Sequence, residues 1–211
     1  MIGVLGFTWG STFLVIELAL QGITPAWLAA GRLGFAALLM TAGLVWRRQR
    51  LFIDPELPRP WLLLVVVALL STFVPFVFLT WGQQFVTSGF AGVSMAAVAL
   101  FVLPLAHFLV PGEQITLLKS LGFLIGFLGV CFLIGADALT SSGQSLESMG
   151  RLACLGTATC YAISSVLMRR LPPVDPITLA GVSLFIGGLA SIPYAYWMEG
   201  PPPAMDRETL F

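Results

Sequence analysis

The chain reads WLLLVVVALLSTFVPFVFLTWG from Trp61 to Gly82, a stretch without a charged residue. A helix that spans a membrane needs ~20 mostly apolar residues, and this stretch is long enough. A membrane β-strand would instead show about 10 residues of alternating polarity, whereas this run is continuously apolar. The stretch therefore predicts a transmembrane helix.

Six further apolar runs fill most of the remaining chain. They are Ile2 to Leu20, Pro25 to Trp46, Ser88 to Val110, Leu117 to Ile134, Gly150 to Met168 and Pro176 to Met198. The composition agrees, because 58% of the residues are hydrophobic and 9% are charged, whereas about 25% are charged in a soluble domain. We predict an all-α polytopic membrane protein with seven transmembrane helices in the lipid bilayer.

Basic residues concentrate in or beside every second gap between these runs. They are Arg47, Arg48, Arg50, Arg59, Lys119, Arg169 and Arg170, and the opposite gaps hold little beyond Arg151 and Arg207. Cytoplasmic loops are enriched in Lys and Arg, so we expect the N-terminus to be cytoplasmic and residues 199–211 to lie outside. The formal net charge is zero, which implies no polyanionic partner such as nucleic acid.

Two helix hairpins resemble each other. The first reads ITPAWLAAG over Ile23–Gly31, and the second reads VDPITLAGV over Val174–Val182. In both, Pro opens a helix at a first-turn position, where its missing N–H costs nothing. Five expected helices separate the copies, an odd number, so the second is inverted. Inverted repeats are typical of transporters, with the substrate path at their interface; chance similarity is the alternative.

Several short motifs follow one another in a recognisable order. They are Trp9-Gly10-Ser11-Thr12, Arg32-Leu33, Gln84–Gly92, Ala106–Thr116 (AHFLVPGEQIT) and the glycine-rich Leu121–Gly135. In order and spacing these motifs resemble the EamA-like permeases of the drug/metabolite transporter superfamily. The chain departs from that family at Ala99, where a proline is frequent, and has Pro104 instead.

The resemblance implies a domain organisation. Such permeases usually have ten helices in two five-helix halves. We therefore assign residues 1–135 to a first five-helix repeat, 136–149 to an external linker and 150–198 to the first two helices of an inverted second repeat. Residues 199–211 form a polar, proline-rich tail. On this interpretation about three helices are missing, and the chain is a truncated product or a fragment.

Two of the ionisable residues within the expected spans stand out, Glu17 and Arg32. Such groups are costly in a membrane unless they are paired, hydrated or close to an interface. Glu17 and Arg32 lie at comparable depths in adjacent antiparallel helices, so an ion pair between them is plausible. Either residue could instead meet a charged substrate or a proton, while the alternative is a pair that only neutralises itself.

Aromatic and polar residues extend the candidate site. Trp9 falls in mid-span beside Gly10, where a substrate could approach the backbone closely, so we expect it to line a cavity. Trp81 and Gln84 share one helix face and either line the path or belong to the interfacial belt. The candidate substrate-binding residues are Trp9, Ser11, Thr12, Glu17, Arg32, Trp81 and Gln84.

Other notable residues have structural interpretations. Glu113 is well placed to cap the fifth helix or to pair with Lys119. Gly122, Gly126 and Gly129 share one helix face, which permits close helix approach and predicts an internal seam or a homodimer contact. The cysteines lack the paired spacing of a metal site, so we expect no metal and no cofactor.

Transport is the leading functional hypothesis. The resemblance implies a permease that moves a small metabolite or amphipathic compound across a bacterial inner membrane, by export and alternating access. The second hypothesis is a non-transporting product that is inactive or serves as a partner subunit. A remote third is an intramembrane hydrolase, which needs a nucleophile with a base in reach. Ser94 and His107 are over three turns apart on one helix, so we expect no enzyme.

Overall fold

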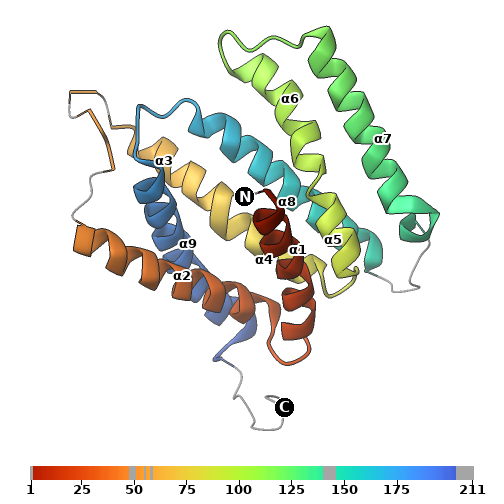
Figure 1. Ribbon diagram of the computed structural model, residues 1–211. Helices are drawn as coiled ribbons and strands as arrows, with labels where there is room; N and C mark the ends of the chain where they lie inside the picture. Colours follow the sequence, from red (N-terminus) through yellow and green to blue (C-terminus); the bar gives the residue numbers. More distant parts are fainter. Residues whose placement is uncertain (1, 48–50, 55, 58, 140–145, 203–211) are drawn as a thin grey trace.

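The computed structural model describes residues 2–47, 51–54, 56–57, 59–139 and 146–202. Its elements are α1 (Ile2–Ala19), α2 (Pro25–Arg47), α3 (Trp61–Ala68), the π-helical η1 (Leu69–Phe73), α4 (Val74–Gly82), α5 (Ser88–Ser94), α6 (Ala97–Leu109), α7 (Leu117–Leu139), α8 (Glu147–Met168) and α9 (Pro176–Glu199). Since α3, η1 and α4 form one rod and α5 and α6 another, the helices make seven rods (Figure 1). The predicted all-α polytopic fold is confirmed.

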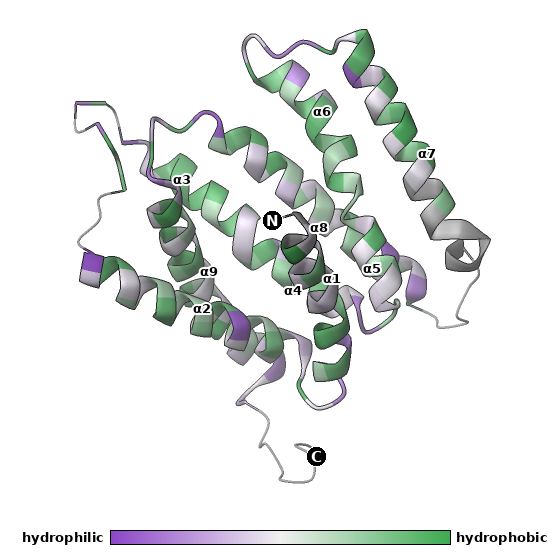
Figure 2. Cartoon of the chain, viewed as in Figure 1, coloured by the Kyte–Doolittle hydropathy of each residue, from purple (hydrophilic) through white to green (hydrophobic). Residues whose placement is uncertain are grey.

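Five rods in the described ranges are long and apolar enough to cross a membrane. They are Pro25–Arg47, Trp61–Gly82, Ser88–Leu109, Glu147–Met168 and Pro176–Glu199, and Leu117–Gly129 is a shorter apolar helix. Figure 2 shows hydrophobic residues along the rods and hydrophilic residues mainly near helix ends and in loops. This distribution suits helices whose surroundings are lipid rather than water.

Helices α2 and α9 form the most extensive helix pair in the described chain. They run antiparallel, because the end of α9 contacts the start of α2. Glycines permit the close approach: a Cβ at Gly188 would lie 3.2 Å from the Cβ of Ala37, and one at Gly187 only 2.9 Å from the Cβ of Thr72 in η1. Helix α8 packs against α4 and α6, so both α8 and α9 contact helices of the N-terminal part directly.

The third rod is interrupted in its middle by η1. Pro75 follows this π-helical turn and has no N–H to donate to the helix ladder. Thr72 Oγ1 donates to Ala68 O at 2.6 Å and to Ser183 O of α9 at 3.2 Å, while Thr157 of α8 donates to Pro75 O at 3.2 Å. The interruption is therefore braced by both helices of the second hairpin. The run of apolar residues gave no sign of it.

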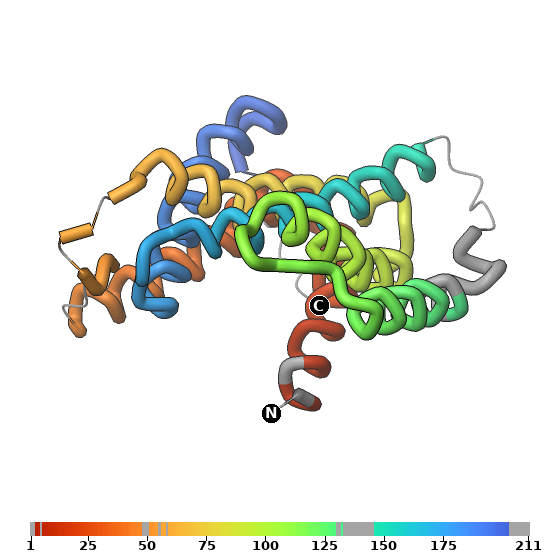
Figure 3. The backbone as a smooth tube through the Cα atoms, turned by 90° about the horizontal axis from the view of Figure 1, so that it is seen from above, coloured from red at the N-terminus to blue at the C-terminus, as the bar shows by residue number. Residues whose placement is uncertain are grey.

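The fourth and fifth rods differ from expectation in detail. The fourth breaks at Met95 and Ala96, whereas Pro104 remains inside α6. Helix α7 packs on α5 and α6 and lies at the far edge from the loop after α2 (Figure 3). A Cβ added at Gly122, Gly126 or Gly129 would meet no described atom within 4 Å. The predicted internal seam is therefore not formed within the described chain, and a homodimer contact there stays a prediction.

The loops that carry most of the basic residues meet at one end of the molecule. Ile53 N donates to Pro173 O at 3.2 Å and Asp175 N donates to Leu51 O at 3.0 Å, around a bridge between Phe52 and Val174. The loop after α6 joins them, because the Arg170 guanidinium donates to Leu109 O. Every second gap thus lies on the same side, as the alternation of basic residues requires.

Element boundaries shift the expected linker and tail. Helix α7 continues to Leu139 and α8 begins at Glu147, so helix covers both ends of the expected linker 136–149, and residues 140–145 lie outside the described part. Helix α9 continues to Glu199, the first residue of the expected tail, of which 203–211 lie outside the described part.

Candidate functional site

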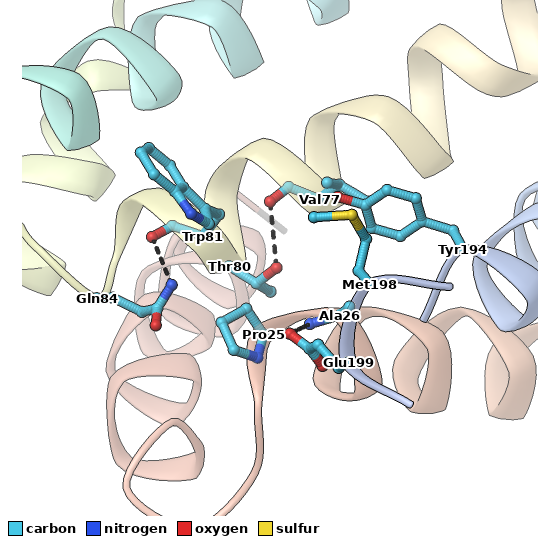
Figure 4. A pocket seen from close by; sticks show the side chains of 9 residues that line it. All are labelled: Pro25, Ala26, Val77, Thr80, Trp81, Gln84, Tyr194, Met198 and Glu199. Carbon is cyan, nitrogen blue, oxygen red and sulfur yellow. Dashed lines mark hydrogen bonds between the residues drawn. The ribbon is translucent and has the colours of Figure 1, made fainter. Parts of the chain in front are cut away.

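A pocket of about 250 Å³ lies where α2, α4 and α9 come together (Figure 4). Its lining comprises Pro25, Ala26, Val77, Thr80, Trp81, Gln84, Tyr194, Met198 and Glu199. Two of the predicted site residues, Trp81 and Gln84, are among them. The pocket combines aromatic and apolar walls with a few polar groups, as small-molecule sites generally do. We call it the outer pocket, because positive-inside reasoning puts this end outside.

One wall of the outer pocket is built by Glu199, the last residue of α9. Its Oε1 accepts a hydrogen bond from Ala26 N at 2.9 Å, and its Oε2 accepts from Trp27 N at 3.2 Å and from Thr24 Oγ1 at 2.5 Å. The first N–H groups of a helix have no partner within it, and the positive end of the helix dipole favours an anion there. Glu199 therefore caps α2 from another helix.

Aromatic contacts close the same end. Trp27 Nε1 donates to Gly200 O at 3.1 Å, and the Trp27 ring meets Tyr196 edge to face with centroids 4.9 Å apart. Gly200 has a φ of 74°, in the left-handed region that favours glycine, directly after α9. These contacts join the start of α2 to the end of α9 beside the pocket.

Trp81 and Gln84 form the α4 side of the pocket. The Gln84 amide donates to Trp81 O at 3.2 Å, and the Trp81 ring lies 5.0 Å from that of Phe85. Because Gln84 is exposed and bonded only to its own turn among the described contacts, its amide oxygen is available to a ligand.

Arg32 lies deeper in α2 and faces α4. Its guanidinium carbon sits 4.8 Å from the centre of the Phe76 ring, a cation–π arrangement. Tyr161 of α8 lies near it. Its Nη1 is buried and has no hydrogen-bond partner among the described residues. Among the described residues, the Arg32 guanidinium therefore has neither an acidic partner nor a hydrogen bond at Nη1.

Glu17 does not pair with Arg32 in the described structure. Its Oε2 instead accepts a hydrogen bond from Ser88 N at 2.8 Å, at the start of α5, where the Thr87 hydroxyl also accepts from Phe90 N at 3.3 Å. Glu17, which lies on α1, thus caps the start of α5. The plausible ion pair of the sequence analysis is not formed, because helix-start N–H groups lie closer to this carboxylate.

Trp9, Ser11 and Thr12 lie on α1, apart from the outer pocket. Trp9 lines a second cavity of about 450 Å³ between α1 and α5, beside Gly10 and Phe13. Ser11 and Thr12 both donate to Thr8 O, at 3.1 and 2.9 Å, which leaves their oxygens as possible acceptors. Of the residues predicted on α1, only Trp9 lines this cavity. The structure therefore does not bring the predicted site residues together in one place.

At the opposite end of the molecule, Glu113 joins two basic side chains. Lys119 Nζ lies 3.0 Å from Glu113 Oε2, which confirms the expected pair, and Arg169 Nη1 lies 2.5 Å from Oε1. The hydrogen bond from Lys119, followed by that from Arg169, holds the pKa of Glu113 below its ordinary value of 4.5. This cluster ties the loop before α7 to the turn after α8.

The hydrolase hypothesis finds no support in the same region. Ser94 Oγ donates to Phe90 O at 2.8 Å, and His107 Nδ1 lies 3.2 Å from Glu113 O. Each side chain has a partner other than the remaining member of the supposed pair. A nucleophile needs its base within hydrogen-bond reach, so these two residues do not form such an arrangement.

Sequence reasoning missed several residues of the outer pocket. Glu199 was assigned to a polar tail, and Tyr194 and Met198 were simply part of an apolar run. A signal did exist for Glu199: an inverted repeat brings the end of its second helix beside the start of the corresponding helix in the first copy. An acidic residue at that end then faces unpaired helix N–H groups.

The long apolar helices and the way they pack on one another define the chain as a multi-pass membrane protein. The chain belongs to the EamA-like transporter family, which it matches over residues 1–135. The resemblance noted from the short motifs is thereby confirmed.

Three individual relatives match most of this chain at low sequence identity. The chain is 26% identical over 207 residues to the uncharacterized transporter YoaV of Bacillus subtilis, covering 97% of this chain and 69% of YoaV. It is 32% identical over 186 residues to a WAT1-related chloroplastic protein of Arabidopsis thaliana, covering 87% of this chain and 43% of that protein. For protein PagO of Salmonella typhimurium the identity is 25%, with 92% and 62% covered.

A crystal structure shares the fold. It superimposes with a TM-score of 0.62 at 21% sequence identity, covering 92% of this chain and 67% of the other. The chain thus spans from 43% to 69% of the length of the relatives named above.

Proposed function

We propose that this chain moves a small metabolite or amphipathic compound out of the cell by alternating access. The observation that carries the proposal is the direct packing of the inverted hairpin, α8 and α9, against α2, α4 and α6 of the first repeat. Transporters of this construction place the substrate between their repeats and rock one against the other. Arg32 and the outer pocket lie at this junction.

The candidate residues have distinct roles in this proposal. Trp81, Gln84 and Arg32 line the path between α2, α4 and α9, and Trp9, Ser11 and Thr12 line the side of α1. Glu17, whose carboxylate accepts a hydrogen bond from Ser88 N of α5, is the residue that couples transport to protons in this proposal. The N-terminus lies in the cytoplasm of a bacterial inner membrane, with the outer pocket on the far side.

The test compares export by the wild-type chain with export by a variant whose outer pocket is filled. Cells carry the wild-type chain or the Gln84→Trp variant, which fills the outer pocket from an exposed position. Leu62→Trp, at a side chain 80% exposed on α3, is the matched control for an added indole. Untargeted mass spectrometry of the medium should show at least one compound that accumulates with wild type and Leu62→Trp and falls several-fold with Gln84→Trp. If every variant is present in the membrane at the same level and no compound differs in concentration between the media, the result would contradict transport.

One observation favours the second hypothesis, a partner subunit. Helix α7 packs mainly on α5 and α6 among the described elements, with Leu117 and Leu118 about 80% exposed. A chain that acts only with a partner would export nothing alone and would gain export when the partner is co-expressed. The same mass-spectrometric comparison, with single-molecule photobleaching to count copies, separates this hypothesis from a homodimer.

A further inference from the structure

Arg32 is placed where a charge is costly. It follows Pro25, the first residue of α2, by seven positions, so it lies ~10 Å along the helix from its outer end. Ionisable residues at such depth usually face a partner or a substrate path. The surroundings of Arg32 therefore bear on function.

The described chain supplies this guanidinium with no counter-charge. Its ion pairs among described residues all involve Glu113 or Glu147, and neither reaches Arg32. Glu17, the nearest candidate by sequence, is bonded to Ser88 N. A guanidinium carries five N–H donors, and Nη1 is both buried and unbonded.

The neighbours of Arg32 hold it without neutralising it. Phe76 offers a ring face 4.8 Å away, which orients the planar group and attracts its charge but accepts no directional hydrogen bond. Tyr161 of α8, which lies near Arg32, carries a phenol that is neutral near pH 7 and supplies no counter-charge. The guanidinium is therefore held in one orientation, and its positive charge can interact with an anionic ligand.

Arg32 lies beneath the outer pocket rather than apart from it. Seven residues are close to two helical turns, so Arg32 and the pocket residue Pro25 share one face of α2. On α4, Phe76 precedes the pocket residue Thr80 by four positions and shares its face. The carboxylate of Glu199 at the pocket wall is already bonded to the start of α2, so its charge is compensated.

Arg32 also adjoins the interrupted third rod. Phe76 follows Pro75 directly, and the π-helical η1 ends at Phe73. Local π-helical turns are frequent at functional sites, and interrupted helices often form the substrate site between transporter repeats. Arg32, Phe76 and Tyr161 come from α2, α4 and α8, and therefore from both repeats.

We propose that Arg32 binds the oxyanion of the transported compound, so that the substrate is a small amphipathic organic acid. This inference rests on the proposed function and names its substrate class. A planar guanidinium matches a carboxylate or phosphate with two parallel hydrogen bonds. The apolar body of the acid then lies toward Trp81, Tyr194 and Met198 in the outer pocket.

The test measures binding apart from transport. The purified chain is placed in phosphatidylcholine nanodiscs, and its thermal unfolding is followed with acetate, benzoate, indole-3-acetate or benzyl phosphate. Each acid is compared with its neutral amide, or with benzyl alcohol for the phosphate. At least one acid should stabilise the wild type at a concentration at least tenfold below its neutral counterpart. Arg32→Gln should abolish this preference, and Arg32→Lys should retain part of it.

Controls separate the charge from general damage. Arg59→Gln removes an exposed arginine of the loop before α3 and should leave the preference unchanged. Each variant must unfold cooperatively without ligand; if Arg32→Gln does not, Phe76→Leu replaces it and should weaken acid binding several-fold by releasing the guanidinium.

Other outcomes overturn the inference. It fails if no acid is preferred, or if the preference survives in Arg32→Gln. It also fails if phosphatidylglycerol in the nanodisc stabilises the protein through Arg32 while no small acid does, because the site then holds a lipid phosphate. Acid binding without export would support the role of Arg32 and contradict the proposed function. Export of a neutral compound without acid binding would support the proposed function and contradict the role of Arg32.

Discussion

The two ends of the α2 and α9 pair are held together differently. At the outer end, α2 takes its cap from Glu199 on α9, 173 residues away from Ala26 in the sequence. At the opposite end, α9 is capped by Asp175, the residue directly before it, whose Oδ1 accepts from Thr178 N at 2.9 Å. The start of α2 therefore depends on a neighbouring helix, whereas the start of α9 is self-sufficient.

This difference arises between two copies of one sequence pattern. Thr24 and Asp175 occupy equivalent positions before Pro25 and Pro176, yet the Thr24 hydroxyl donates to Glu199 instead of capping its own helix. If α9 moves away from α2 at the outer end, α2 loses its cap. Movement at the opposite end leaves the Asp175 cap intact and instead breaks the backbone hydrogen bonds from Asp175 N to Leu51 O and from Ile53 N to Pro173 O. Separation of α9 from α2 at the outer end would therefore leave the first N–H groups of α2 without their acceptor.

The largest effect is expected midway between the two ends, at Gly187. A Cβ there would lie 2.9 Å from Thr72 Cβ, and Thr72 is held by two hydrogen bonds. Gly187→Ala should lower the free energy of unfolding by about 2–3 kcal/mol, the usual cost of overpacking. Thermal unfolding in detergent micelles measures it. Gly122→Ala, which enters open space, is the control and should be neutral or slightly stabilising; equal losses would mean that the crossing is not tight.

The next effect tests the borrowed cap. Glu199→Ala removes three hydrogen bonds to the start of α2 and should cost about 2 kcal/mol, as for other bonds to a charged group. Glu199→Gln keeps one amide acceptor and should cost roughly half as much. Hydrogen exchange at Ala26 and Trp27 should rise in Glu199→Ala. Unchanged exchange there would show that the cap is not needed to hold α2.

A smaller effect is expected at the self-capped end. Asp175→Ala removes the side-chain acceptor for Thr178 N, but the backbone bond from residue 175 to Leu51 O remains possible. The unfolding midpoint should fall by less than in Glu199→Ala, and Asp175→Ser should restore most of it, since serine is also a good N-cap. If Asp175→Ala proves more damaging than Glu199→Ala, the contrast between the two ends is reversed.

The smallest effect depends on pH at the Glu113 cluster. Because Lys119 and Arg169 hold the pKa of Glu113 below 4.5 in the folded chain, the charged carboxylate adds stability above pH 4.5. That contribution is lost as pH falls through the lowered pKa. The difference in unfolding midpoint between wild type and Glu113→Gln should therefore be constant near neutral pH and shrink below about pH 4.5. A difference that grows on acidification would contradict this assignment.

The fold was largely predictable because a spanning helix must be apolar along its whole length. The seven helical runs and the end of the molecule at which the basic loops gather both follow from local sequence. The interruption at η1 was not predictable, because Pro75 permits a break without specifying a π-helical turn. The break at Met95 likewise lacks a proline of its own. Linker ends were also misjudged, since α7 continues past the last strongly apolar residues.

The candidate site was predictable only in part. A charge within an apolar run is conspicuous, which is why Glu17 and Arg32 could be selected. Their partners could not, because Ser88 and Phe76 lie on helices whose rotation about their own axes is set by packing. Glu199 was overlooked since an acidic residue at a helix end is ordinary until its neighbour is known.

The sequence by itself determined the number of helical rods, the end of the molecule at which the basic loops gather and the family. Each of these depends on hydropathy, charge or motif order within a short stretch of chain. Only the tertiary structure decided that Glu17 caps α5, that Glu199 caps α2 and that Arg32 Nη1 has no hydrogen-bond partner among the described residues. Such pairings join residues far apart in the chain, and they depend on how closely packed helices turn toward one another.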